Sequence, residues 1–260
     1  EEYAEAVRLA KGRPVTFRTL DLGGDKRLGD LADEANPFMG YRAVRLCLER
    51  PDVFRPQLRA LVRAAALGPV QVMFPMISGV EELRRAKAVF RDVEAELARE
   101  GVRPVEAIRL GAMIEIPSAA LVADSLAAEA DFFSVGTNDL VQYLLAVDRG
   151  NQRVASLYDP CHPAVVRTLM AIFAAAQKAG IPAAVCGELG GDPVWAPLLI
   201  GLGVHELSMS PAALPEVRFV LRHSTAAELR ELAAQVVACD DAARTRALLQ
   251  EFAAAKLKLR

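Results

Sequence analysis

Only four cysteines occur in the 260 residues, widely scattered, without a CxxC pair and without a histidine at zinc-ligand spacing. These absences argue against a disulfide framework and against a structural zinc site. A reducing, cytoplasmic environment is therefore expected.

Long apolar runs are also missing. The longest, APLLIGLGV at 196–204, is broken by two glycines and is far shorter than the roughly 20 residues that a membrane span needs. The first twelve residues form an acidic helical pattern rather than a secretory signal, and without an initial Met we expect a piece of a longer protein. Because 31 basic residues balance 33 acidic ones, we expect neither nucleic-acid nor membrane partners.

What the chain does have is a regular alternation of apolar, β-rich segments with longer helical ones. Such runs, joined by crossover helices, are typical of parallel strands in a doubly wound sheet or a (β/α)8 barrel. One unbroken alternation over residues 1–260, with no linker, favours a single-domain (β/α)8 TIM barrel. We predict six strands, at 15–21, 70–76, 109–116, 131–137, 181–188 and 205–210. Two short strands near 36–42 and 154–158 would complete the eight.

Helices are clearest between the second and third strands and at the end of the chain. The apolar spacing at 79–100 predicts an amphipathic helix that ends at Gly101. Thr225 and Glu228 fit a capping box at the start of one or two final helices.

Polar residues collect where the predicted strands end, which in parallel α/β folds is the edge where active sites form. Glu115 and Asp139 end consecutive strands. If those strands pair, at a spacing of about 4.8 Å, the two carboxylates can share one Mg²⁺, an ion usually held by one or two carboxylates plus substrate oxygens and water. The alternative is that Glu115 pairs with an arginine of the core and Asp139 caps a helix starting at Leu140.

Arginines form the second group of candidates: Arg18, Arg42, Arg63 and Arg149. A guanidinium matches phosphate and carboxylate oxygens, so converging arginines predict an anionic substrate. For Arg63, in an alanine-rich helix, a solvated surface position is an equally good interpretation.

Cys186 ends another predicted strand, in the string VCGE. A cysteine in that position is usually a small buried apolar residue, but its neighbours at the strand ends make it a candidate proton donor. An ordinary thiol, with a pKa of about 8.5, keeps its proton at neutral pH.

Eight strings, in order along the chain, now point to a family. They are FRTLDLGGDK, NPFMGYRAVR, MFPMISGVEEL, MIEIPSAA, DFFSVGTNDLVQYLLAVDRGN, YDPCHPAV, VCGELGGDP and LSMSPAALPEVR, and they span about residues 14–222. The sequence resembles the phosphoenolpyruvate-binding domain of the phosphoenolpyruvate-protein phosphotransferases, enzyme I of the bacterial sugar phosphotransferase system.

The resemblance implies a barrel that binds phosphoenolpyruvate and Mg²⁺, releases pyruvate and forms a homodimer. By motif, the phosphate and carboxylate would be held by Arg18 and Arg42, with Arg149 completing the clamp. Asn138 would contact the phosphate. Arg63 falls where the family often has a further phosphate-facing arginine. Glu115 and Asp139 would bind Mg²⁺, and Cys186 would protonate the enolate of pyruvate.

In one respect the chain departs from the family. The acceptor in such enzymes is a histidine in a Gly-rich motif on an amino-terminal domain, which passes the phosphoryl group on to a phosphocarrier protein. None of His162, His205 and His223 lies in such a motif. We therefore expect a domain that binds the substrate but needs the phosphohistidine domain to complete transfer.

Three other functions compete with this one. A carboxyl-terminal domain of a pyruvate phosphate dikinase or phosphoenolpyruvate synthase shares the GTND and CGE strings, but AVDRGN followed by SLYDP favours enzyme I. A noncatalytic dimerising or regulatory domain fits poorly with retention of every candidate residue. An aldolase-like lyase explains Mg²⁺ and an enolate but not the arginines.

Overall fold

The structure, a computed structural model, describes residues 1–22 and 34–258. The Gly-Gly-Asp-Lys segment at 23–26, part of one family string, lies outside the described residues. The chain divides into two compact units: unit 1 comprises residues 1–113 and 129–132, and unit 2 comprises 114–128 and 133–260.

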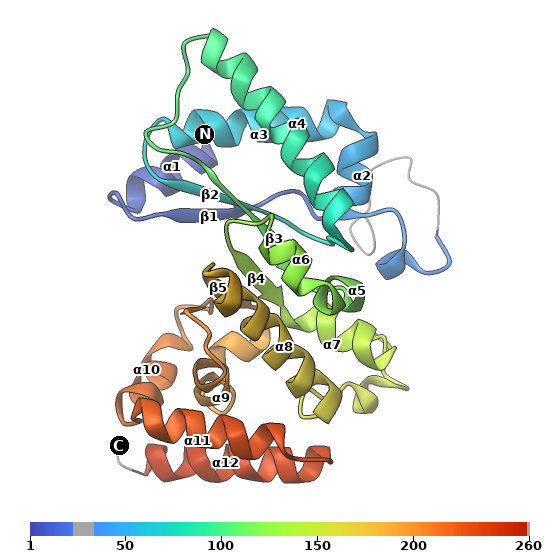
Figure 1. The fold of residues 1–260 in the computed structure, drawn as a ribbon, viewed down its shortest axis with the longest axis vertical. Coiled ribbons are helices and arrows are strands. Elements are labelled where there is room, and N and C mark those ends of the chain that lie inside the picture. The colour runs from blue at the N-terminus through green and yellow to red at the C-terminus, as the bar shows by residue number, and fades with distance from the viewer. Residues whose placement is uncertain (23–33, 259–260) are drawn as a thin grey trace. The chain divides into compact units, whose positions relative to one another are not determined.

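Unit 1 is an α/β layer in which the strands run parallel. Its elements are α1 (Glu2–Leu9), β1 (Val15–Arg18), a 3₁₀ turn η1 (Pro37–Met39), α2 (Ala43–Glu49), α3 (Pro51–Ala65), β2 (Val70–Phe74), α4 (Val80–Arg99) and β3 (Arg109–Ile114), whose last residue is counted in unit 2. β1 pairs with β2 from Val15 opposite Val70 to Arg18 opposite Met73, and β2 pairs with β3. In Figure 1, α3 and α4 lie together over the β1–β2 pair.

The apolar stripe of α4 explains this packing. Leu83, Phe90, Val93 and Leu97 are spaced three, four and seven residues apart, so they share one face, and all four are buried. Glu82 accepts a hydrogen bond from the Ser78 amide at 2.7 Å and so satisfies the start of the helix. The predicted helix at 79–100 is thereby confirmed.

Unit 2 repeats the parallel arrangement and ends in a helical hairpin. It contains α5 (Pro117–Leu121), α6 (Ala123–Ala127), β4 (Phe133–Gly136), α7 (Thr137–Leu145), η2 (Ala155–Leu157), α8 (Pro163–Ala179), β5 (Ala183–Cys186), η3 (Glu188–Gly191), α9 (Ala196–Gly201), β6 (Glu206–Leu207), α10 (Leu214–Arg222), α11 (Ala226–Val237) and α12 (Ala242–Leu257). β4 pairs with β5 from Phe133 opposite Ala183 to Gly136 opposite Cys186, and β5 pairs with β6. Figure 1 shows α11 and α12 side by side as an antiparallel pair.

All six predicted strands are present, each shorter than expected, whereas the two additional strands are not. The segments near 36–42 and 154–158 contain the 3₁₀ turns η1 and η2 instead. Pro37 cannot donate to a strand ladder, and the Asn151 carbonyl accepts the amides of Val154 and Ala155, which curls that segment into a turn. The structure therefore shows a parallel α/β fold and does not confirm the full eight-stranded barrel.

The tail after residue 224 agrees with its prediction. The Thr225 hydroxyl accepts the Glu228 amide at 3.2 Å, and the Glu228 carboxylate accepts the Thr225 amide at 2.7 Å, so the capping box of α11 is formed. This exchange satisfies two amides that the first turn of a helix otherwise leaves open.

Candidate functional site

Glu115 lies against the carboxyl end of β4. It follows β3 directly and is 3% exposed. A Cβ atom placed on Gly136 would lie 2.5 Å from Glu115 Oε2, closer than any side chain tolerates. Gly136 is therefore the residue that makes room for this buried carboxylate.

Asp139 stands in the first turn of α7, three residues after Gly136, and is 8% exposed. The N-cap of α7 is Gly136, so Asp139 does not cap a helix starting at Leu140 as the alternative interpretation had it. The positive end of the helix dipole favours a carboxylate at this position. Glu115 and Asp139 thus belong to one strand-to-helix junction, through Gly136.

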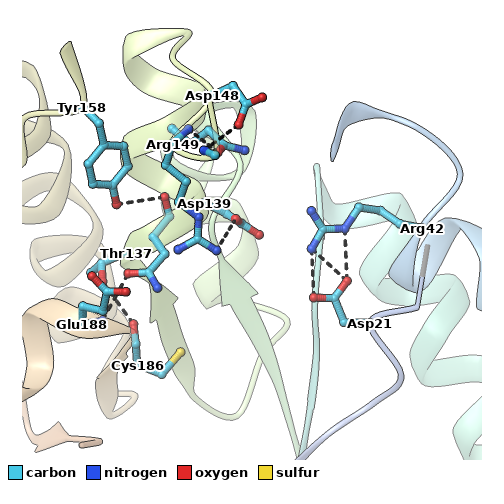
Figure 2. Close-up of polar contacts among 12 residues, drawn as sticks. Asp21, Arg42, Thr137, Asp139, Asp148, Arg149, Tyr158, Cys186 and Glu188 are labelled. Atoms are coloured by element: carbon cyan, nitrogen blue, oxygen red, sulfur yellow. Dashed lines mark hydrogen bonds and ion pairs between the residues drawn. The ribbon is translucent and has the colours of Figure 1, made fainter. Parts of the chain in front are cut away.

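Arg149 returns to the same junction. Ala146 adopts a left-handed conformation, with φ of 53°, and ends α7, after which the Arg149 amide donates to Gln142 Oε1 at 3.1 Å. The Arg149 guanidinium then lies 3.9 Å from Asp139 Oδ1 (Figure 2). This ion pair is too long for a direct hydrogen bond, and the Arg149 side chain is 38% exposed. It is thus accessible to an incoming anion.

Asn138 and Thr137 join α7 to the end of β5. Thr137 Oγ1 donates to the Cys186 carbonyl at 3.2 Å, and Asn138 Oδ1 accepts the Glu188 amide at 3.1 Å (Figure 2). Gly187, which lies between Cys186 and Glu188, has a φ of 105°, and a Cβ there would lie 2.6 Å from the Thr137 hydroxyl. Both the backbone angle and the crowding require glycine at this position.

Cys186 is the last residue of β5 and lies opposite Gly136 in the strand register. Its half-buried sulfur accepts a hydrogen bond from Ser134 Oγ at 3.2 Å and donates to the Val135 carbonyl at 3.5 Å. It is a free thiol. The structure thus places a proton-bearing group beside the junction that carries the carboxylates.

Tyr158 is a neighbour of the site that the sequence analysis missed. Its hydroxyl donates to the Asn138 carbonyl at 3.2 Å (Figure 2). Burial raises the pKa of Tyr158 to about 12; Arg149 lowers it, whereas Glu188 and Asp139 raise it further. The string YDPCHPAV drew attention to this segment, but nothing in its spacing connects it with α7.

In unit 1, Asp21 organises two of the predicted arginines. Arg42 donates from Nε to Asp21 Oδ1 at 3.1 Å and from Nη2 to Oδ2 at 2.9 Å, and Arg18 Nη1 lies 3.1 Å from Oδ2 (Figure 2 shows the Arg42 bonds). The side chains of Asp21 and Arg42 are 5% and 8% exposed, and that of Arg18 is 38% exposed. The forked guanidinium thus holds a carboxylate in two-point geometry.

Arg63 is not brought to this cluster. It lies near the end of α3, has a 58% exposed side chain and pairs with Glu100 at 3.5 Å. The chain passes from α3 into the amino end of β2, whereas Arg18 ends β1, and the two strands are parallel. Arg63 therefore lies at the opposite end of the strands from Arg18.

The donor set at the α7 junction suits a hard cation. Among residues 1–22 and 34–258, no cluster of three or more His, Cys, Asp or Glu side chains could hold a metal ion. Mg²⁺, however, needs only one or two carboxylates when substrate and water supply the remaining oxygens. Glu115 and Asp139 fit that requirement.

A search for membrane spans found, in the described part of the chain, no helix that is both long and apolar enough to cross a bilayer.

Comparison with known sequences identifies the class. The family described as "PEP-utilising enzyme, PEP-binding domain" matches residues 1–226, so the chain belongs to this family of phosphoenolpyruvate-binding domains. More specifically, it is 45% identical over 254 residues to the phosphoenolpyruvate-protein phosphotransferase of Staphylococcus carnosus, covering 97% of this chain and 44% of that protein. The phosphotransferase of Priestia megaterium is 48% identical over 229 residues, covering 87% of this chain and 40% of the relative.

These matches confirm the resemblance that the motifs indicated. The chain spans less than half the length of these relatives. Among solved structures, a citrate lyase from Burkholderia xenovorans LB400 matches with a TM-score of 0.50 and 19% identity, covering 80% of this chain and 70% of that chain. At that identity the likeness shows the α/β fold alone.

Proposed function

We propose that this chain is the substrate-binding domain of a phosphoenolpyruvate-protein phosphotransferase. It binds phosphoenolpyruvate together with Mg²⁺, and the phosphoryl group passes to a histidine on a separate domain as pyruvate is released. The observation that carries the proposal is the α7 junction, where buried Glu115 and Asp139 are accompanied by Arg149. The sequence relatives, which bear that enzyme name, support it.

Each polar group of the junction has a role in this proposal. Glu115 and Asp139 are the Mg²⁺ ligands, and bound Mg²⁺ would supply positive charge to the enolate and phosphoryl oxygens. Arg149, whose link to Asp139 is long and which is partly exposed, exchanges that contact for the phosphate. Asn138 contacts the phosphate through its side chain, which the Glu188 amide orients. Phosphoryl transfer relies mainly on such positioning and charge.

For unit 1 we propose that Arg18 and Arg42 bind the substrate anion. Asp21 holds Arg42 at two points, which fixes the plane of the guanidinium before substrate arrives, so less conformational entropy is lost on binding. Because Arg63 is engaged with Glu100 at the other end of the strands, it has no part in this proposal.

Cys186 is the proposed proton donor. Cleavage between phosphorus and the enol oxygen leaves the electron pair on that oxygen, giving the enolate of pyruvate. The Cys186 thiol then gives its proton to C3, forming the methyl group of pyruvate and a thiolate that solvent reprotonates. Ser134 Oγ donates to the sulfur at 3.2 Å, a bond that stabilises the thiolate.

The three histidines are each used at the end of a structural element, which supports an acceptor outside this chain. His162 Nδ1 accepts the Ala164 amide as the cap of α8, and His205 Nδ1 accepts the Ala183 amide beside β5. His223 stacks on Phe219, with ring centroids 4.1 Å apart. The proposal therefore includes an amino-terminal phosphohistidine domain and a phosphocarrier protein as partners.

Further parts of the proposal rest on the family resemblance. They are a single domain formed by residues 1–260, a homodimer, a cytoplasmic location and a place at the first step of sugar transport. The close sequence relatives favour this enzyme over a pyruvate phosphate dikinase or phosphoenolpyruvate synthase.

Calorimetric titration of the chain with phosphoenolpyruvate tests the binding function. We expect binding that requires Mg²⁺, loss of the Mg²⁺ dependence in Asp139→Asn, and affinity reduced more than about tenfold in Arg149→Ala, since hydrogen bonds to charged groups contribute about 1.5–3 kcal/mol. Glu251→Gln, an exposed carboxylate on α12, is the matched control. No binding by the unaltered chain, or undiminished binding in both variants, would refute the proposal.

Transfer needs a second experiment. The chain is mixed with the amino-terminal domain of a phosphotransferase, phosphoenolpyruvate and Mg²⁺, and phosphohistidine and pyruvate are measured. Stoichiometric appearance of both products is expected. Substrate binding without either product would reduce the proposal to a binding domain.

A further inference from the structure

The segment between η2 and α8, residues 158–162, lies against the candidate site without supplying any of the residues assigned to it. Tyr158 donates its hydroxyl to the carbonyl of Asn138, at 3.2 Å, in the first turn of α7. The next residue in that turn is Asp139. A shift of Tyr158 would therefore move the first turn of α7, which carries Asn138 and Asp139, the residues proposed to bind phosphate and metal.

Local hydrogen bonds make this segment a rigid turn. Asp159 Oδ1 accepts the Cys161 amide at 3.0 Å, and the Asp159 carbonyl accepts the His162 amide at 3.1 Å. Pro160 has a fixed φ, and His162 caps the helix that follows. Because the turn is rigid, the position of Asp159 determines the position of Tyr158.

The position of Asp159 is in turn fixed by an ion pair with the carboxyl-terminal hairpin. Arg246 Nη2 on α12 lies 2.8 Å from Asp159 Oδ2, the carboxylate oxygen not used in the turn. An open pocket of about 340 Å³ is lined by both segments and by the stretch before α9; its lining includes Tyr158, Asp159, Cys161, Trp195, Arg246 and Leu249. The ion pair is thus a direct polar link between α12 and the turn, at the wall of this pocket.

We propose that Tyr158 and Arg246 are positioning residues for phosphoenolpyruvate and Mg²⁺ binding. Arg246 anchors the turn through Asp159, and Tyr158 holds the first turn of α7, with Asn138 and Asp139, in its binding orientation. This inference rests on the proposed function of the α7 junction. It also extends that function to α12, a helix beyond the residues 1–226 that the family match covers.

The proposal is tested by affinity for phosphoenolpyruvate with Mg²⁺ in a set of single variants. Tyr158→Phe loses one part-buried hydrogen bond and is expected to bind about fivefold more weakly. Arg246→Gln is expected to bind about two- to threefold more weakly, because the ion pair is partly exposed. Arg246→Lys keeps the charge and should restore affinity, whereas Arg244→Gln, an exposed arginine on the same helix, should change nothing.

A double variant distinguishes a connected chain from two separate effects. If Arg246 acts through Tyr158, the Tyr158→Phe, Arg246→Gln protein binds no more weakly than Tyr158→Phe alone. Fold reductions that multiply, or unaltered affinity in both single variants, would overturn the inference.

A second readout separates this inference from the proposed function. Amide hydrogen exchange in α7, measured without substrate, should accelerate in both Tyr158→Phe and Arg246→Gln and not in Arg244→Gln. Failure of the unaltered chain to bind phosphoenolpyruvate refutes the function, whereas unchanged α7 exchange in both variants refutes the positioning role whatever the chain binds.

Discussion

The two units organise their charged groups in opposite ways. In unit 1 two arginines surround one carboxylate, Asp21, and the contact to Arg42 is short and almost fully buried. In unit 2 two buried carboxylates share one junction with one arginine, and the contact between Arg149 and Asp139 is long and open. A tight buried pair fixes geometry, whereas a loose one can be exchanged for a ligand, so unit 1 is the more rigid cluster and unit 2 the more adaptable.

The largest expected effect follows from removing the carboxylate of unit 1. Asp21→Ala leaves the buried Arg42 guanidinium without its two-point partner and should lower the free energy of unfolding by about 3–5 kcal/mol. Urea denaturation measures this. Asp52→Ala is the control, because its pair with Arg50 is 2.7 Å long but both side chains are at least half exposed, so a change below about 1 kcal/mol is expected. Equal effects of the two substitutions would contradict the contrast in burial.

The next effect concerns chemistry that only unit 2 is proposed to carry. Cys186→Ala removes the proton donor and should slow exchange of the pyruvate methyl protons with deuterated solvent by about 10²- to 10⁴-fold, measured by NMR with Mg²⁺ present. Phosphoenolpyruvate affinity should change little. The control is Cys239→Ala, at a buried cysteine of the same unit; this variant should catalyse the exchange at the normal rate, and a similar loss there would show that the effect is structural.

A smaller effect is expected from filling the space that Glu115 occupies. Gly136→Ala places a methyl group 2.5 Å from Glu115 Oε2 and should cost about 1–3 kcal/mol of unfolding free energy, with Mg²⁺-dependent binding weakened as Glu115 shifts. Gly79→Ala meets nothing within 4 Å and should stay within about 1 kcal/mol of the original, as for a change at a helix cap. Thermal or urea unfolding of both variants measures this difference. If Gly136→Ala lowers the free energy of unfolding no more than Gly79→Ala does, the junction is not tightly packed.

The smallest effect is a titration at high pH. Because the folded-state pKa of Tyr158 is raised to about 12, its contribution to stability is fully present below its unfolded pKa, about 10, and is lost as the pH rises through 12. Tyr158→Phe should therefore flatten the fall in unfolding free energy over that window. Ultraviolet titration of the tyrosines should also lose one late-ionising group. A tyrosine that ionises near its ordinary value would contradict the buried environment of Tyr158.

The elements of the fold were predictable because each carries a local signal. Apolar runs gave the six strands, and the spacing of Leu83, Phe90 and Leu97 gave α4. The two additional strands were wrong, because the expectation of eight came from the fold class and not from the residues; Pro37 and the Asn151 turn favour 3₁₀ geometry. The number of strands expected from the fold class therefore overrode the local sequence signals, which did not indicate strands at these two segments.

At the site, the predicted strand ends located most of the candidate residues, but the contacts between their side chains could not be predicted. As the sequence predicted, Glu115 directly follows β3 and Cys186 ends β5, whereas Asp139 lies in the first turn of α7, three residues after β4. The sequence could not show that Asp21 bonds both arginines or that Tyr158 reaches Asn138. Those contacts join residues whose distance in sequence has no relation to their distance in space. Their roles in binding remain predictions that the variants above address.

Gly136 and Gly187 have a consequence for how substitutions at this site are interpreted. Gly136 yields its side-chain space to Glu115, and Gly187 yields its space to Thr137 and Asn138. In a saturation-mutagenesis screen for phosphoenolpyruvate binding, both positions should score as intolerant as the charged residues themselves, although neither has a functional group. A map of inactivating substitutions would therefore outline the site partly by residues that take no part in its chemistry.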